Sequence, residues 1–177
     1  MRAIVLATDG VEDSEFNYPY YRLQEAGHEV DVATPDGETI EGKTGYEFEA
    51  DYAIDEYDAD RWADEYDLLV VPGGYSPEPL RLEAPEAADI VAAFDDADQP
   101  IAAICHGAQL LISADVLEDR SVAAYWSLED DVENAGATFV DEEVVVDDNL
   151  VTARVPDDLP AFASEVLALL EEEPIAA

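Results

Sequence analysis

The chain lacks three features that would each point to a class of protein. It has a single cysteine, so no disulfide can form within it. Seven basic residues stand against 45 acidic ones, so no basic patch exists to release the counterions of a nucleic acid. No apolar run approaches the roughly 20 residues that a membrane span needs, and residues 1–8 read as a strand and not as a signal peptide. We therefore expect a cytoplasmic protein that binds neither nucleic acid nor membrane.

The shortage of basic residues leaves a formal net charge of −38 beside 49% apolar residues. Self-repulsion on this scale opposes a compact state in dilute buffer. It becomes tolerable in molar salt, where the Debye length falls to about 3 Å. Because the carboxylates are spread along the whole chain between regular apolar periods, we interpret them as the surface of a halophilic protein. An acidic protein that binds a basic partner is the alternative.

Apolar runs of strand and helix type alternate from end to end, without linker or repeat, over the 177 residues. This pattern predicts one α/β domain (1–177) with a mainly parallel sheet sandwiched by helices. The predicted strands are residues 3–7, 30–33, 68–71, 101–104 and 122–124, with a hairpin of 139–146 and 150–153. The predicted helices are residues 18–26, 87–94, 108–112, 128–135 and 159–170, the last capped by Asp158, and residues 37–51 are expected to form turns and edge structure.

The segment Ile101 to Gln109 carries the clearest functional signal. A buried strand ends on Cys105 and His106, and Gly107 leads into a helix. This is the arrangement of the nucleophile elbow of hydrolases, with cysteine in place of serine. The free N–H groups and the dipole at a helix N-terminus stabilise a thiolate, which predicts a low thiol pKa. A lone cysteine is often only a space-filling core residue, but packing alone does not require the Cys-His-Gly turn, and we therefore predict a catalytic nucleophile.

Two other loops are expected beside the thiol, because the carboxyl ends of parallel strands meet at one edge of a sheet. Gly73 and Gly74 follow the strand 68–71, and their N–H groups with that of His106 are candidates for an oxyanion hole. An ordinary tight turn explains the two glycines equally well. Glu12 lies in the first loop, where burial and a nearby negative charge would favour its protonated form. Its alternative role is that of one more surface glutamate.

The histidine count restricts the mechanism. Only His28 and His106 occur, and His28 follows a helix end, where we expect a structural role. Without a histidine after His106, the triad of class I glutamine amidotransferases is excluded, and His106 is the only general base available. No Cys/His cluster suggests zinc, and we expect neither a metal nor a cofactor.

With these residues the chain resembles the PfpI family of intracellular proteases, related to the parkinsonism-associated deglycase and to the class I amidotransferases. The resemblance covers nearly the whole chain. It rests on the motifs Phe16-Asn17-Tyr18-Pro19-Tyr20, Val71-Pro72-Gly73-Gly74, Pro77-Glu78, Ile104-Cys105-His106-Gly107 and Arg154-Val155-Pro156. It implies a flavodoxin-like fold of the class I glutamine amidotransferase-like type, and the chain departs from it in its acidic surface and in Tyr75-Ser76.

The resemblance also implies roles for individual residues. Cys105 matches the nucleophile, His106 its adjacent histidine, and Glu12 the glutamate that hydrogen-bonds the sulfur. Glu78 matches a glutamate that reaches the histidine of a neighbouring subunit in dimeric or hexameric members. Gly74 and His106 match oxyanion donors, and Tyr125 matches a tyrosine near the site.

The implied function is a cofactor-independent cysteine hydrolase that acts on reactive carbonyls. Its substrates would be methylglyoxal, converted to lactate, or glycated protein adducts, cleaved to the repaired amine. A peptidase that uses the same thiolate through an acyl-enzyme is the second enzymatic hypothesis. A non-catalytic stress protein, either a redox sensor or a chaperone, in which Cys105 is oxidised to sulfinic acid, is the alternative of another class.

Overall fold

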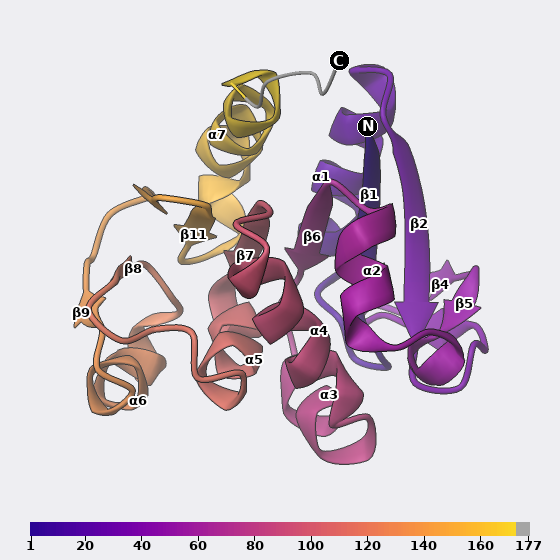
Figure 1. The fold of residues 1–177 in the computed structure, drawn as a ribbon, viewed down its shortest axis with the longest axis horizontal. Helices are drawn as coiled ribbons and strands as arrows, with labels where there is room; N and C mark the ends of the chain where they lie inside the picture. The colour runs from indigo at the N-terminus through magenta and orange to yellow at the C-terminus, as the bar shows by residue number, and fades with distance from the viewer. Residues whose placement is uncertain (173–177) are drawn as a thin grey trace.

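A computed structural model describes residues 1–172, which form a seven-stranded sheet between two layers of helices (Figure 1). All neighbouring strands of this sheet are parallel except the hairpin of β10 and β11. In order across the sheet the strands are β10 (Val144–Asp147), β11 (Leu150–Ala153), β7 (Ile101–Ile104), β6 (Leu68–Val71), β1 (Arg2–Leu6), β2 (Glu29–Thr34) and β5 (Tyr52–Ala53). Two small sheets stand apart: β3 (Ile40–Glu41) with β4 (Glu47–Phe48), and β8 (Ser121–Val122) with β9 (Thr138–Phe139).

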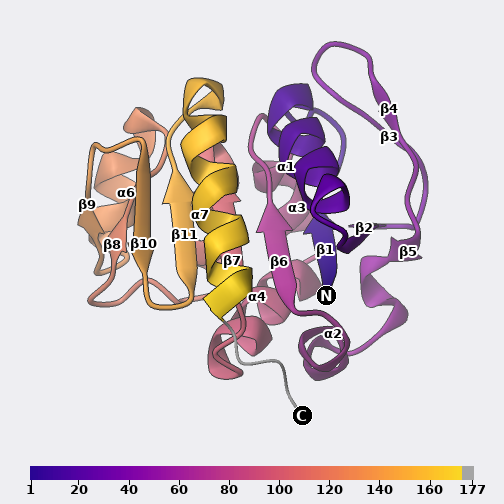
Figure 2. The same ribbon diagram turned by 90° about the horizontal axis from the view of Figure 1, so that it is seen from above.

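Helices cover both faces of the large sheet (Figure 2). One face carries α1 (Asp13–Glu25) and α7 (Leu159–Glu172), which pack side by side. The other helices are α2 (Ala59–Glu65), α3 (Pro77–Glu83), α4 (Glu86–Asp96), α5 (Ala108–Ser113) and α6 (Glu129–Asn134). Short 3₁₀ turns complete the chain: η1 (Ile54–Glu56), η2 (Cys105–Gly107), η3 (Trp126–Leu128) and η4 (Pro156–Asp158). No helix within residues 1–172 is long and apolar enough to cross a bilayer.

The two layers follow from the alternation of side chains along the strands. In β1, Ile4 and Leu6 belong to the core beneath α2 and α4, whereas Ala3 and Val5 belong to the core beneath α1 and α7. A strand buried on both faces reads as a continuous apolar run, and this is the pattern from which the sequence predicts a parallel sheet. The predicted α/β class, the strands at 3–7, 30–33, 68–71 and 101–104 and the hairpin are confirmed. The predicted strand 122–124 is not part of this sheet, because only Ser121–Val122 is a strand and it pairs with β9 in a separate small sheet; the predicted strand 139–146 is divided between β9 and β10.

Three of the local predictions were wrong. Helix α1 begins at Asp13 and includes Pro19, whereas the proline had suggested a start at Tyr18. The stripe of Phe16, Pro19 and Leu23 is buried, so packing outweighs the local cost of proline. Helices α2 and α3 were not predicted, because α2 buries only Trp62 and Ala63 and the seven residues of α3 include two prolines. The carboxylate of Asp158 binds the guanidinium and backbone N–H of Arg154, in place of the predicted helix cap.

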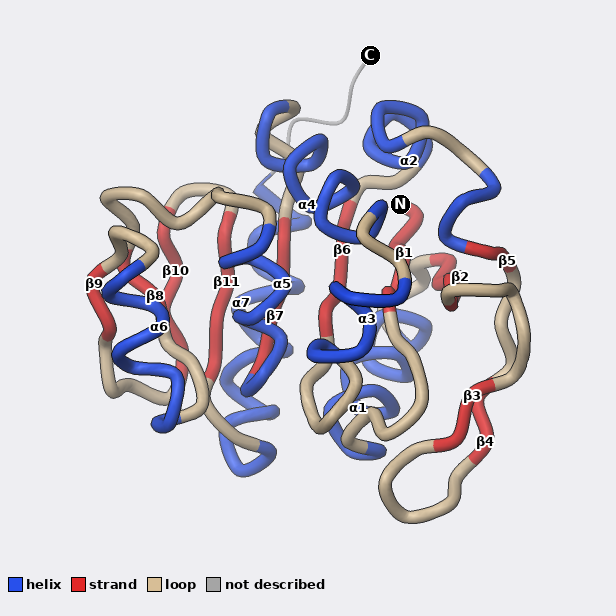
Figure 3. The backbone as a smooth tube through the Cα atoms, turned by 90° about the horizontal axis from the view of Figure 1, so that it is seen from below, coloured by secondary structure: helices blue, strands red, loops and turns tan. Residues whose placement is uncertain are grey.

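The hairpin of β3 and β4 lies beyond the main sheet and carries its turn toward the first loop (Figure 3). Asp13 holds this turn in place: its two carboxylate oxygens accept from the backbone N–H and the hydroxyl of Thr44, at 3.0 and 2.7 Å. The N–H of Lys43 donates to the carbonyl of Val11 at 2.9 Å. The turn is thereby bound to the start of α1 from both sides.

Candidate active site

The loops after β1, β6 and β7 meet at one edge of the sheet, as the sequence predicts, and the β3–β4 turn closes over them. They enclose a cavity of about 300 Å³. Its lining residues are Glu12, Glu15, Lys43, Gly74, Tyr75, Cys105, His106, Tyr125 and Pro156.

Cys105 occupies a strained backbone position at the end of β7. Its φ is +61°, in the left-handed region that few residues other than glycine adopt. The next turn requires Gly107, because a side chain there would run into the carbonyl of Val71 in β6. Such strain is typical of a nucleophile elbow, where the turn lifts one side chain above the sheet. The predicted elbow geometry is therefore present.

The sulfur of Cys105 is mostly enclosed, with 7% of the residue exposed. It lies 3.3 Å from Nδ1 of His106. The backbone N–H groups of His106 and Gly74 lower the pKa of the thiol. Burial and the negative charge of Glu15 have the larger, opposite effect, and they raise the pKa of Cys105 to about 12. The predicted low thiol pKa was wrong, because burial and the charge of Glu15 outweigh the effect of the backbone N–H groups.

Glu15 is the carboxyl group beside the sulfur. Its side chain is fully buried, and a methyl group built on Gly73 would come within 2.6 Å of its Oε2 and 2.9 Å of Cys105 Cβ. Oε2 accepts a hydrogen bond of 2.9 Å from the Gly73 N–H, while Oε1 has no partner within residues 1–172. Burial raises the pKa of Glu15 to about 7, although the Cys105 thiol and the Gly73 N–H oppose this rise. A carboxyl with one free oxygen and a pKa near neutrality therefore lies at the thiol.

The assignment of this position to Glu12 was wrong. Glu12 precedes the first turn of α1 in an extended conformation and faces the outer part of the cavity. Its carboxylate accepts 2.9 Å from Lys43 Nζ and 3.3 Å from the hydroxyl of Ser14. Glu15 is nearly one helical turn further on, in the buried stripe with Pro19 and Leu23 at spacings of four and eight residues. A glutamate in an apolar stripe was the available signal, and starting the helix at Tyr18 concealed it.

The glycine turn also differs from expectation in one respect. The Gly73 N–H is occupied by Glu15, so it is not available to an oxyanion. The N–H groups of Gly74, whose φ is +75°, and of His106 both lower the pKa of the Cys105 thiol. Two of the three predicted donors thus remain in place beside the thiol.

Lys43 is a site residue that the sequence analysis missed. It is the only lysine in the chain, and it reaches the cavity from the β3–β4 turn. Its ammonium group pairs with Glu12 and lies 5.1 Å from the centre of the Tyr75 ring. The signal was its uniqueness among 45 acidic residues, but nothing in the sequence places this turn over the elbow.

His106 lies between the sulfur and Tyr125, whose ring stacks on the imidazole at 4.6 Å between centroids. The N–H of Tyr125 donates to the carbonyl of Cys105 at 3.2 Å. Burial and the positive charge of Lys43 lower the pKa of His106, against the effect of Glu78. Glu78 lies on the exposed side of α3 and outside the cavity lining. Tyr125 is thus at the site, and Glu78 acts on the histidine only through its charge within one chain.

Groups of three or more His, Cys, Asp or Glu side chains with a geometry suited to a metal ion are absent from residues 1–172.

The sequence pattern of the DJ-1/PfpI family matches residues 1–169. The chain belongs to this family. Among its relatives, Protein/nucleic acid deglycase 2 of Escherichia coli is 48% identical over 168 residues, which are 94% of this chain and 95% of that one. YraA of Bacillus subtilis, named after an assumed cysteine protease activity, is 41% identical over 168 residues, 94% and 96% of the two chains.

Solved structures of the family share the fold described above. The DJ-1/ThiJ/PfpI-like domain of a two-domain protein from Anabaena variabilis superposes with a TM-score of 0.90 at 35% identity. The match covers 96% of this chain and 48% of that one, whose other domain is ferritin-like. The predicted resemblance to PfpI proteins and the fold class that it implied are confirmed.

Proposed function

We propose that this family member is a cysteine-dependent enzyme that acts on reactive carbonyls, without a cofactor. It either converts methylglyoxal to lactate or removes such groups from protein amines. The main support is the buried Glu15 carboxyl, which has one free oxygen, next to a buried thiol in a strained elbow. Cys105 is the nucleophile, and Glu15, in place of Glu12, is the group that exchanges a proton with it.

The titration of the pair supports this division of roles. Glu15 and Cys105 interact, so their two protons leave in steps that belong to the pair. The first leaves at about pH 7, where Glu15 titrates, and the second at about pH 12. Between these values the pair carries one negative charge and one proton. The form with the proton on Glu15 and the charge on sulfur, which the N–H groups of His106 and Gly74 stabilise, is the attacking species.

The reaction on methylglyoxal balances without an external oxidant or reductant. The thiolate forms an S–C bond with the aldehyde carbon, and Glu15 gives its proton to the resulting oxyanion, which produces a hemithioacetal. Glu15 or His106 then moves the proton on this carbon to the neighbouring carbonyl carbon, while the hydroxyl proton of the hemithioacetal passes to the neighbouring oxygen, and the product is a lactoyl thioester. Water cleaves the thioester to lactate and returns the proton to sulfur. The two backbone donors stabilise the oxyanions of the first and last steps.

The test is lactate formation from methylglyoxal by the purified protein, without added thiol. We expect turnover by the wild type and none by Cys105→Ala. Fluorogenic peptides, assayed in parallel, test the peptidase alternative. The same thiolate and oxyanion donors suit an acyl-enzyme, and the YraA relative carries a protease name. Peptide cleavage without lactate formation would replace the carbonyl hypothesis by the peptidase one.

A redox or chaperone role predicts a different result, in which peroxide oxidises Cys105 and neither substrate is turned over. Intact mass distinguishes the sulfinic acid, which is heavier by two oxygen atoms.

Self-association is part of the proposal. The exposed position of Glu78 on α3 suits a carboxylate that reaches His106 of a second copy in a dimer or hexamer. Glu78→Ala should then lower activity without changing the size of the assembly, measured by light scattering. Full activity in a monomer would contradict the shared site.

We also propose that the acidic surface is an adaptation to high salt in the cytoplasm. Repulsion between copies that each carry −38 should weaken the assembly when salt falls from molar to about 0.1 M. Activity and assembly size should therefore decrease together on dilution of salt. An assembly that is equally stable in dilute buffer would contradict the adaptation.

A further inference from the structure

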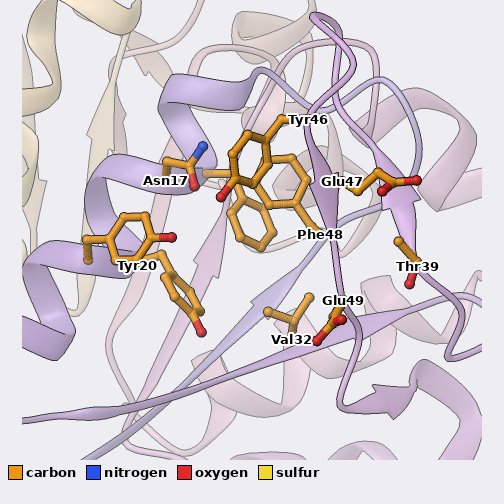
Figure 4. Close-up of a pocket in the computed structure, with 10 residues that line it drawn as sticks. Asn17, Tyr20, Val32, Thr39, Tyr46, Glu47, Phe48 and Glu49 are labelled. Carbon is orange, nitrogen blue, oxygen red and sulfur yellow. The ribbon is translucent and has the colours of Figure 1, made fainter.

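Outside the catalytic cavity, the molecule has a larger pocket of about 520 Å³ between α1, β2 and the β3–β4 hairpin (Figure 4). We call it the aromatic pocket. Five of its lining residues are aromatic: Phe16, Tyr20, Tyr21, Tyr46 and Phe48. The proposed reaction uses none of them.

The rings form a continuous surface. Phe48 lies 4.0 Å from Phe16 and 4.9 Å from Tyr46, measured between ring centroids. Tyr20 continues the surface at 5.8 Å from Phe16 and meets Tyr21 edge-on at 5.2 Å. Phe48 is buried, whereas Tyr21 and Tyr46 are about half exposed. Solvent thus reaches one side of an aromatic wall whose other side is anchored in the core.

The charged residues that line the aromatic pocket are all acidic. Glu47 and Glu49 line the pocket, and none of its ten lining residues is basic. Figure 4 shows Glu49 next to Val32, on one side of the rings of Tyr46 and Phe48, and the carboxylate of Glu47 directed away from these rings. Carboxylates are common on this surface, but here two of them line a pocket together with five aromatic residues. A cation with an apolar stem satisfies both, because ring faces attract cations and its methylene groups pack on the rings.

Two short segments of the chain, one in α1 and one in the β3–β4 turn, connect the aromatic pocket with the catalytic cavity. Glu15, at the thiol, and Phe16, in the pocket, are consecutive residues of α1. Lys43, at the cavity, and Tyr46, in the pocket, are three residues apart in the turn, a span of at most about 11 Å. An extended peptide covers such a distance with three or four residues.

We infer that the aromatic pocket binds a lysine or arginine side chain of a protein substrate, a few residues from the modified residue that reacts at Cys105. This inference rests on the proposed function and gives the enzyme a preference for adducts in basic segments. A protein of charge −38 attracts such segments over a distance, and the pocket provides the specific contact.

The test compares two peptides that each carry one methylglyoxal-modified lysine. Three residues away, one has trimethyllysine, a cation that methylglyoxal cannot modify, and the other has neutral norleucine. At a fixed salt concentration we expect the cationic peptide to have a KM about tenfold lower. Tyr46→Leu and Glu49→Gln should each remove most of this difference.

Matched controls lie on the same two elements. Tyr18→Leu changes an exposed α1 tyrosine outside the pocket lining, and Glu41→Gln changes a hairpin carboxylate outside it. Both should keep the difference between the peptides. Turnover of free methylglyoxal should be unchanged in all four variants, because none of them alters a residue placed at the thiol.

The outcomes separate this inference from the proposed function. Equal KM values for the two peptides, with methylglyoxal still turned over, would overturn the pocket and leave the function intact. If neither substrate reacts, the function fails, and fluorescence titration of Cys105→Ala with the unmodified peptides then tests the pocket by itself. Equal affinities of Cys105→Ala for the two peptides would show that the pocket binds no cationic side chain. If Tyr46→Leu loses the oligomer and neither peptide is preferred, a second copy of the chain occupies the pocket.

Discussion

Two glutamates three residues apart divide the cavity into a buried half and an exposed half. Glu15 belongs to the buried half, together with Cys105 and Gly73. One oxygen of its carboxyl group accepts from the Gly73 N–H, and the other has no hydrogen-bond partner in the described chain. Glu12 belongs to the exposed half with Lys43 and Tyr75, where its charge is paired and partly solvated. The same side chain therefore has a pKa near 7 in one place, and in the other it is an ordinary ion-pair partner. Chemistry should depend on the buried half, and fine adjustment on the exposed half.

The largest expected effect is at the sulfur. Cys105→Ala removes the nucleophile and should abolish lactate formation, and Cys105→Ser should do nearly the same because a hydroxyl does not ionise in this pH range. Circular dichroism should show both variants folded. Residual activity of Cys105→Ala above the uncatalysed rate would contradict the nucleophile assignment.

Glu15→Gln should have the next largest effect. A neutral amide keeps the hydrogen bond with Gly73 but cannot exchange a proton, so turnover should fall by about 10²-fold or more. In the wild type, alkylation of Cys105 by iodoacetamide should rise as pH increases through about 7, where the pair loses its first proton. Glu15→Gln should lack this step, and an unchanged alkylation profile would show that Glu15 does not control the thiol.

The raised pKa of the buried Glu15 should also make the free energy of unfolding depend on pH. Burial raises the pKa of Glu15 from 4.5 to about 7, so the folded protein retains a proton that the unfolded chain has lost. The free energy of unfolding should therefore fall as pH rises from about 4.5 to 7 and level off above, by up to about 3 kcal/mol at 1.4 kcal/mol per pKa unit. Urea unfolding at pH 5 and 8 measures this change. Because the other carboxylates are common to both proteins, the difference between wild type and Glu15→Gln isolates Glu15.

Substitutions in the exposed half should have smaller effects, and those at Lys43 and Glu12 should shift the midpoint of the pH–rate profile in opposite directions. The positive charge of Lys43 lowers the pKa of Glu15, so Lys43→Met should move the midpoint of the pH–rate profile upward and reduce the rate at pH 7 several-fold. Glu12 raises the pKa of Glu15, so Glu12→Gln should move the midpoint downward.

Glu12→Gln should change the maximal rate by less than about fivefold, since an exposed pair contributes at most about 1 kcal/mol. A loss as large as that of Glu15→Gln would restore Glu12 to the proton-transfer role and cancel the distinction between the two halves.

Asp13→Ala should have the smallest effect. It removes the two hydrogen bonds that hold the Lys43 turn, and so it should reproduce part of the pH shift of Lys43→Met. Asp13→Asn can still bond both groups of Thr44 and should restore the wild-type midpoint. If Asp13→Ala keeps the wild-type profile, the turn does not depend on this contact.

Local patterns were enough for the frame of the molecule. The continuous apolar runs predicted a parallel sheet, because a strand buried on both faces has no polar side, and Asp147-Asp148-Asn149 predicted the hairpin at β10 and β11. The strand, the Cys-His-Gly turn and the helix predicted the elbow for the same reason: all three parts are contiguous in the chain. Helices α2 and α3 escaped prediction, since α2 has only two buried residues and α3 contains two prolines.

What the sequence by itself determined is thus the fold class and the position of Cys105 and His106 within it. Which carboxyl lies at the sulfur was decided only in the tertiary structure, because it depends on where α1 begins and which stripe of it the sheet buries. The approach of Lys43 was decided there too, since it requires a hairpin some 60 residues away to be fastened over the elbow by Asp13 and Val11. Contacts between distant segments follow from packing, and the chemistry of this cavity rests on such contacts.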